Sequence, residues 1–380
     1  MRREARPFAV GGAAALALGV MGAFFDPAQF FRAYLIGFIL CASLALGSLA
    51  VLMLHHLAGG RWGFVLRRFV EAGARTMPLV AVMFVPVYLG RRWIYSWSRP
   101  EVWHADARLV HKHAYLNAPF FLARAAVVFG VWIALAWVLT RWSDRQDREP
   151  SPELARAIQR LSAPGLILYA ATTLFAAVDW IMSVTPMWFS AIFGMLFMVS
   201  HGVTAMAFSI LALRALFGRK EVFLEVRPVV FRDLGNLLFM FLMLWAYMSF
   251  SQLIIIWSAN LPEEIAWYLP RLQTSWKFVS LALLLFYFAV PFSVLLSRRV
   301  KERLPRLAKV AAVVLAMRWL DVVWLIEPSY HPGGLWISWM DLLVPAGLVA
   351  VWTAAYCSGL LARPLFALHD ARVEERVEHG

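Results

Sequence analysis

Charged residues are scarce in this chain of 380 residues, of which Asp, Glu, Lys and Arg make up 16%, against about 25% in soluble domains. Hydrophobic residues make up 62%. This composition excludes a water-soluble protein. The longest stretch without an apolar run, about residues 91–117, is shorter than the roughly 50 residues of a small soluble domain. The sequence therefore predicts a single polytopic membrane domain over residues 1–380.

Cysteine is also scarce, because only Cys41 and Cys357 are present and both lie in apolar runs. Two cysteines cannot form a four-cysteine iron–sulfur ligand set, and no C-x-x-C-H motif for covalent haem occurs. A b-type haem needs two histidines on facing spans, but only one of the nine histidines lies mid-span. His104, His111 and His113 lack carboxylate or thiolate neighbours at ligand spacing. We therefore expect this chain to hold no cofactor, no metal and no catalytic centre of its own.

Long apolar runs predict an all-α integral membrane fold, because about 20 apolar residues are needed to span a bilayer. We expect about ten transmembrane helices. The runs lie at about residues 8–25, 33–57, 72–90, 118–141, 164–184, 188–216, 234–257, 272–296, 307–326 and 335–361. Residues 362–380 would form a tail.

A net charge of +13 could indicate nucleic-acid binding in a soluble protein. Here the positive residues are distributed as expected from the membrane topology. Most of the 36 Lys and Arg residues lie in the two termini and in the loops after spans 2, 4, 6 and 8. By the positive-inside rule these segments are cytoplasmic, although the loop at 91–117 departs from the trend. Many of the 18 tryptophans lie near span ends, as in the aromatic belts that contact lipid headgroups. We expect lipid contacts and no nucleic-acid partner.

The segment after the fourth span predicts a helix start, because Ser151 can cap, Pro152 suits the first helical position and Glu153 follows as an early acid. Apolar residues at 154, 158 and 161 then share one face. We interpret this segment as a separate helix lying at the membrane surface.

Ionisable residues within the spans are the most informative, because a charge near the bilayer centre costs at least about 2.5–3.5 kcal/mol. The candidates are Asp179, His201, Lys277, Arg318, Asp321 and Asp341. Arg318 and Asp321 are three residues apart and can pair on one helix face. The pair is either self-neutralising and structural, or part of a water-lined proton path.

Asp179 lies in the outer part of span 5, and His201 lies near the middle of span 6. Their depths differ by about two helical turns, which favours a water-mediated relay over direct contact. His201 could equally be a core histidine that bonds a neighbouring helix. Asp179 and Asp321 each precede a proline by seven residues. This spacing hints at two four-helix units, spans 2–5 (residues 33–184) and spans 6–9 (residues 188–326).

Several segments resemble one known family. They are HKxxYLNxPFFxxR at 111–124, SAPG at 162–165, DWxMSxxPxWFS at 179–190, DLGNL at 233–237 and QxxIIWSxNLPEEIxWY at 252–268. In these motifs the chain is similar to the second of the two large membrane subunits of bacterial alternative complex III. The likeness runs from about residue 32 to 345, and the last motif is the most specific because it is long and includes polar loop residues.

The resemblance implies a ten-helix protein of the polysulfide-reductase-type (NrfD-like) superfamily, with two four-helix bundles and two peripheral helices, in the bacterial cytoplasmic membrane. It implies a subunit of a respiratory or photosynthetic quinol:electron acceptor oxidoreductase that replaces the cytochrome bc complex. In that family haem c and iron–sulfur clusters belong to other subunits. A sister NrfD-like subunit is thought to hold the main quinol site. The second NrfD-like subunit, which this chain resembles, is often described as quinone-binding and is a candidate for proton transfer.

We therefore expect a cofactor-free subunit of a quinol:cytochrome c oxidoreductase, with structural, proton-path and quinone-contact roles. The proton-path candidates are Asp179, His201, Arg318, Asp321 and Asp341. The expected partners are the sister membrane subunit, an iron–sulfur subunit, haem-c subunits, small membrane subunits and quinol. Two alternatives stay open. One is a pure scaffold subunit, and the other is a stand-alone secondary transporter, against which no matching pair of Gly/Pro-broken spans is found.

Overall fold

The structure, a computed structural model, describes residues 2–103, 110–216 and 227–363. These residues form helices and no strands. Nine of their helical segments are long and apolar enough to cross a membrane. The chain therefore has the architecture of an all-α, multi-pass membrane protein. The predicted tail lies outside the described residues from 364 onward, as does His104.

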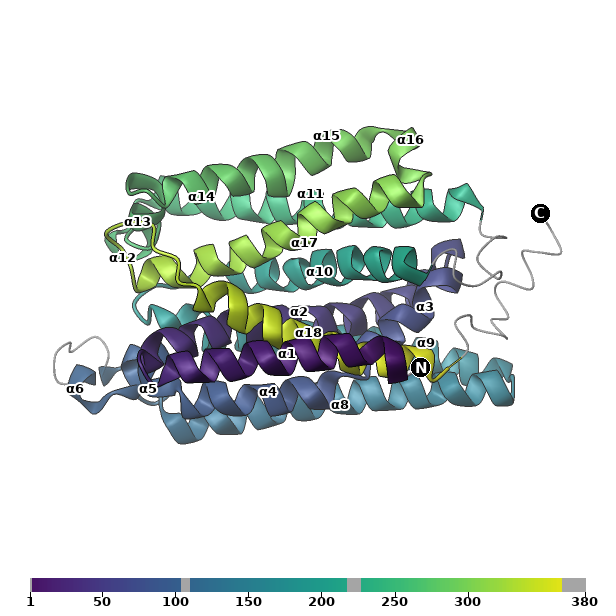
Figure 1. The fold of residues 1–380 in the computed structure, drawn as a ribbon, viewed down its shortest axis with the longest axis horizontal. Helices are drawn as coiled ribbons and strands as arrows, with labels where there is room; N and C mark the ends of the chain where they lie inside the picture. Colours follow the sequence, from purple (N-terminus) through teal and green to yellow (C-terminus); the bar gives the residue numbers. More distant parts are fainter. Residues whose placement is uncertain (1, 104–109, 217–226, 364–380) are drawn as a thin grey trace.

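The helices that make up the nine candidate spans follow the predicted apolar runs. They are α1 (Arg2–Ala23), α2 (Pro27–Ala58), the pair α3 (Arg61–Ala74) and α4 (Met77–Leu89), α8 (Ala118–Arg148), α9 (Pro152–Trp180), α10 (Phe193–Leu216), α11 (Pro228–Ala259), the consecutive α14 (Lys277–Ala282), η4 (Leu283–Ala289) and α15 (Val290–Leu296), and α18 (Met340–Leu361). In Figure 1 they run alongside one another.

The remaining predicted span, the ninth along the chain (residues 307–326), corresponds to α17 (Leu304–Ile326), which packs against α10 and α2. Its 23 residues are enough to cross a bilayer. It differs from the other nine because every stretch of 18 residues within it contains at least three charged residues, Lys309, Arg318 and Asp321. A tenth crossing therefore stays a prediction.

Helix α2 forms the centre of the molecule. It is buried along almost its whole length, as expected of a helix that is hydrophobic all round. It packs against α10, α18, α3, α4 and α9. In Figure 1, α10, α11, α17 and the run from α14 to α15 lie in the upper half of the view, and α4 and α8 lie along its lower edge. Helix α2 thereby links helices from both predicted four-helix units.

Helices α1 and α18 pack along each other in Figure 1. Small residues allow this, because Gly12 faces the backbone of Gly347 and Gly19 faces Val344 with no room for a larger side chain. Close backbone approach at small residues is a common way for membrane helices to associate.

The helix start at Ser151 is confirmed, since its hydroxyl accepts a hydrogen bond from the backbone N–H of Leu154. The prediction of a separate surface helix is wrong, because α9 continues without a break through Pro164 to Trp180. The reason is packing. Ile158 and Ser162 are buried, and the Ser162 hydroxyl lies 3.1 Å from Nδ1 of His56 on α2. The first turns of α9 therefore pack against protein.

Short helices join the spans. They are α5 (Arg91–Ile94), η1 (Ser96–Ser98), α6 (Pro100–Trp103), η2 (Met182–Val184), α12 (Pro262–Ile265), α13 (Tyr268–Gln273), α16 (Arg298–Lys301) and η5 (Glu327–Ser329). Arg271 of α13 ties this layer to α17, because its buried guanidinium donates to the carbonyls of Trp324 and Leu325. A cation at a helix C-terminus satisfies carbonyls that lack partners within the helix.

Candidate functional site

The centre of the bundle holds an ion pair from α17. The Arg318 guanidinium donates to the Asp321 carboxylate, and the two residues are 0% and 4% exposed. This pair was expected from the spacing of the two residues. Arg318 also lies 3.5 Å from the Ser43 hydroxyl of α2, while its Nε has no hydrogen-bond partner. Of the five predicted site residues, these two are in direct contact.

His201 of α10 lies near this pair. Its ring is fully buried, and Nδ1 lies 3.0 Å from the hydroxyl of Tyr169 on α9. Nε2 has no hydrogen-bond partner. Arg318 is within electrostatic range of the ring. The structure thus brings together three of the residues selected from the sequence, and it adds Tyr169.

Tyr287, on the π-helix η4, is within electrostatic range of the same ion pair. Its side chain is fully buried against Trp245, and its hydroxyl has no hydrogen-bond partner. Short π segments within α-helices are frequent at functional sites. Nothing in the sequence marks Tyr287, because it reads as one more aromatic residue in an apolar run.

These groups lie at similar depth. His201 is eight residues into α10, Arg318 is eight residues before the end of α17, and Tyr287 is ten residues past Lys277. At 1.5 Å per residue, each lies about 12–15 Å from the predicted outer end of its span. We call Ser43, Tyr169, His201, Tyr287, Arg318 and Asp321 the central cluster.

Asp179 lies apart from the central cluster. Its two carboxylate oxygens accept hydrogen bonds from Nε and the Nη2 amino group of Arg124 on α8, both at 2.8 Å. The Arg124 guanidinium also stacks on Tyr115, 3.8 Å from the ring centroid. Both members of the pair are buried. Asp179 is therefore engaged in a bidentate salt bridge, and the structure shows no direct link from it to His201.

Asp341 belongs to a second polar group at the predicted outer end of the bundle. Its Oδ1 accepts a hydrogen bond from the Gln29 side chain at 2.6 Å, and its Oδ2 accepts one from the backbone N–H of Ser338 at 2.8 Å. Arg32 interacts electrostatically with both Asp341 and Glu327, and Asp341 also interacts with Glu327.

Glu327 is the most unusual residue of this outer group. It is 0% exposed, and neither carboxylate oxygen has a hydrogen-bond partner in the part of the chain that the structure describes. Nε2 of His331 lies 3.8 Å from Oε2, and the His331 side chain is 28% exposed. Because a buried carboxylate without hydrogen bonds is costly, the protonated form of Glu327 is favoured. The partly exposed His331 is thus next to this buried acid.

Burial raises the pKa of Glu327 to about 8, with the charge of Asp341 adding to the increase and Arg32 opposing it. The pKa of His331 is lowered by burial and by Arg32, while Asp26 opposes the shift. Below pH 6.5, the usual pKa of histidine, the lowered pKa of His331 makes the folded state more stable as the pH rises, whereas the raised pKa of Glu327 makes it less stable. Above pH 6.5 the effect of Glu327 dominates.

We predict that the free energy of unfolding falls as the pH rises from 6.5 to 8. A raised pKa means that the folded state binds the Glu327 proton more tightly, and this advantage is lost as the pH rises towards the folded-state pKa. The expected loss is about 1–2 kcal/mol. Denaturant unfolding in detergent measures it, and Glu327→Gln should remove the slope. An equal slope in both proteins would contradict the assignment to Glu327.

Sequence reasoning missed Arg124, Tyr169, Tyr287 and Glu327. Arg124 stands within a motif of the resemblance, but its partner Asp179 is 55 residues away. Glu327 follows the last turn of α17 and reads as a loop acid. The burial of Glu327 could have been suspected only from Asp321, a charged residue six positions earlier, in α17.

Known proteins do not identify this site. No family model and no curated protein matches the chain. Within the described ranges, no group of three or more His, Cys, Asp or Glu residues is placed to hold a metal ion. The described site is a set of buried titratable and charged side chains.

Proposed function

We propose that this chain is an integral membrane subunit of a quinol:electron acceptor oxidoreductase of the alternative complex III type, and that the central cluster is part of a proton path. The motif resemblance supports membership of the complex. The proton path rests on one observation, the buried Arg318–Asp321 pair within electrostatic range of His201 and Tyr287, each of which has a polar atom without a hydrogen-bond partner among the described residues. Intramembrane charges and histidines commonly mark such paths.

The chemistry proposed for each group follows from its contacts. Asp321 is the proton carrier, and the adjacent positive charge of Arg318 favours its ionised form between transfers. When Nδ1–H of His201 donates to the Tyr169 hydroxyl, Nε2 is free to accept a proton. Asp341 and Glu327, with His331, form the proposed outer end of the route. Asp179 holds α9 to α8 through Arg124 and is assigned a structural role.

The other parts of the proposal concern the complex. The chain binds no haem or iron–sulfur cluster, and these groups lie on partner subunits. The proposed partners are a sister NrfD-like subunit that holds the main quinol site, an iron–sulfur subunit, haem-c subunits and small membrane subunits. The location is the bacterial cytoplasmic membrane, with both termini on the cytoplasmic side. A quinone contact on this chain is part of the proposal.

Asp321→Asn in the purified complex, reconstituted into vesicles, tests the proton path. We expect quinol oxidation to continue while proton movement per electron falls by at least half, because an amide cannot carry the proton. Glu149→Gln is the control, since Glu149 is an exposed acid at the end of α8.

The alternatives give different results. A scaffold role predicts a lower melting temperature or poorer assembly, with unchanged proton movement in the complex that does assemble. A transporter would purify from native membranes in mild detergent without haem-c and iron–sulfur subunits. Either result would overturn the proposal.

A further inference from the structure

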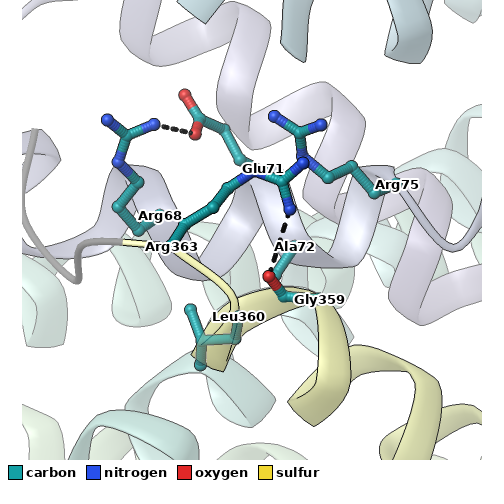
Figure 2. Close-up of a pocket in the computed structure, with 7 residues that line it drawn as sticks. All are labelled: Arg68, Glu71, Ala72, Arg75, Gly359, Leu360 and Arg363. Carbon is teal, nitrogen blue, oxygen red and sulfur yellow. Dashed lines mark hydrogen bonds and ion pairs between the residues drawn. The ribbon is translucent and has the colours of Figure 1, made fainter. Parts of the chain in front are cut away.

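A basic hollow lies at the predicted cytoplasmic face, far along the helices from the outer group. It is formed by α3 and the last turn of α18 (Figure 2). Three arginines line it, Arg68 and Arg75 from α3 and Arg363 just past α18, together with Glu71 and Gly359. Figure 2 shows the guanidinium groups of Arg75 and Arg363 on one side of the hollow and Arg68 on the other.

The Arg75 side of the hollow is short of negative charge. The Nη2 amino group of Arg75 lies 2.7 Å from Oδ1 of Asp144, and Nε of Arg363 lies 3.2 Å from the same oxygen. One carboxylate oxygen thus serves two guanidinium groups. The Nη1 amino group of Arg363 turns to the Gly359 carbonyl, and Nε of Arg75 has no hydrogen-bond partner. Among the described residues, this side therefore carries one positive charge in excess.

The Arg68 side is more nearly neutral. Arg67 and Arg68 each donate to one oxygen of Glu71, and Arg68 also pairs with Asp147. Ser143 donates to Glu71 as well. Among the residues that the structure describes, two carboxylates thus serve two guanidinium groups here, so the excess charge counted for the hollow comes from its Arg75 side. Arg68 is 2% exposed, and its Nε has no hydrogen-bond partner.

The hollow is small and is open beside Gly359. A side chain built at Gly359 would meet no atom within 4 Å. Arg363 follows the last residue of the candidate span Met340–Leu361 by two positions, which places the hollow at the level of lipid headgroups. Basic pockets between transmembrane helices on the cytoplasmic side bind anionic headgroups.

We propose that this hollow binds one phosphate group, and that the phosphate is that of an anionic phospholipid of the cytoplasmic leaflet. Guanidinium groups suit phosphate because their N–H donors form a planar fork. The single negative charge of a phosphodiester matches the single excess positive charge of the hollow. A lipid is favoured over free phosphate because the hollow lies at the end of a candidate span. This proposal is independent of the central cluster and of the complex.

Thermal unfolding of the purified full chain in detergent tests the site. The probes are phosphatidylglycerol, phosphatidylcholine and inorganic phosphate. We expect phosphatidylglycerol to raise the melting temperature of the native chain by about 2–4 °C and phosphatidylcholine to have no such effect. Two variants should lose the shift. Arg363→Gln removes a charge from a partly exposed side chain, and Gly359→Leu fills the hollow while keeping every charge.

Arg145→Gln is the matched control, because Arg145 is an exposed arginine at the same end of the molecule, and its variant should keep the full shift. Native mass spectrometry should show one retained phosphatidylglycerol on the native chain and none on Gly359→Leu. If inorganic phosphate alone gives the shift, the phosphate site stands and the lipid source is wrong. Equal phosphatidylglycerol shifts in the native chain, Arg363→Gln and Gly359→Leu would overturn the site itself.

Discussion

Replacing Asp179 by Ala is expected to lower the free energy of unfolding by about 3–5 kcal/mol, the largest effect of any single side chain considered. The bidentate partner, Arg124, is 9% exposed and would remain buried without a carboxylate. The stacking of its guanidinium on Tyr115 does not neutralise that charge. Reversible unfolding in mixed micelles measures the loss.

Two controls accompany this variant. Glu149→Ala removes an exposed acid from its pair with Arg145 and should change stability by less than about 1 kcal/mol. The double substitution Asp179→Leu with Arg124→Met removes both charges and should recover most of the loss, because apolar replacement of a buried pair is often neutral. If Asp179→Ala is as mild as the control, the salt bridge does not hold α8 to α9. Under the proposed function, in which Asp179 is structural, quinol turnover per assembled complex should be unchanged in either case.

Replacing Gly47 by Ala is expected to cost about 3 kcal/mol or more. The added Cβ would lie 2.0 Å from the carbonyl oxygen of His201 and 2.6 Å from its carbonyl carbon. Both are backbone atoms, so no side-chain rotation relieves the clash. Helices α2 and α10 would have to separate, and the packing around the His201 ring would be disturbed with them.

Gly130→Ala is the matched control for this change, because a Cβ at Gly130 of α8 meets no atom within 4 Å. It should leave stability unchanged or raise it by up to about 1 kcal/mol, since alanine favours the helix. Melting temperatures of Gly47→Ala and Gly130→Ala in the same detergent test this difference in stability. Similar values for both would mean that α2 and α10 are not in close backbone contact.

Local patterns predicted a large part of this fold. Apolar runs located the spans, and the cap at Ser151 located the start of α9 to the residue. The Arg318–Asp321 pair was also predictable, because three residues on one helix fix the distance between the side chains. In each case the interacting groups are close in sequence.

Contacts between distant segments could not be predicted in this way. The partner of Asp179 lies on another helix, and nothing in a single sequence favours Arg124 over the other arginines. The burial of Glu327 depends on α2 and α18 meeting beside the end of α17, which apolar periodicity does not encode. The continuity of α9 through Pro164 had the same cause, since Ser162 packs beside His56 of α2.

The π-helix η4 makes the central cluster sensitive to chain length as well as to residue type. A π turn holds more residues than an α turn, so deleting one residue between 283 and 289 would restore regular α-helix. The helix before and after this segment would keep its orientation, while the side chains inside the segment would point in new directions. Tyr287 would then lose its place beside Arg318 without being substituted. A related chain one residue shorter in this segment would present a different side chain to the ion pair, and an ungapped comparison of identities would not reveal it.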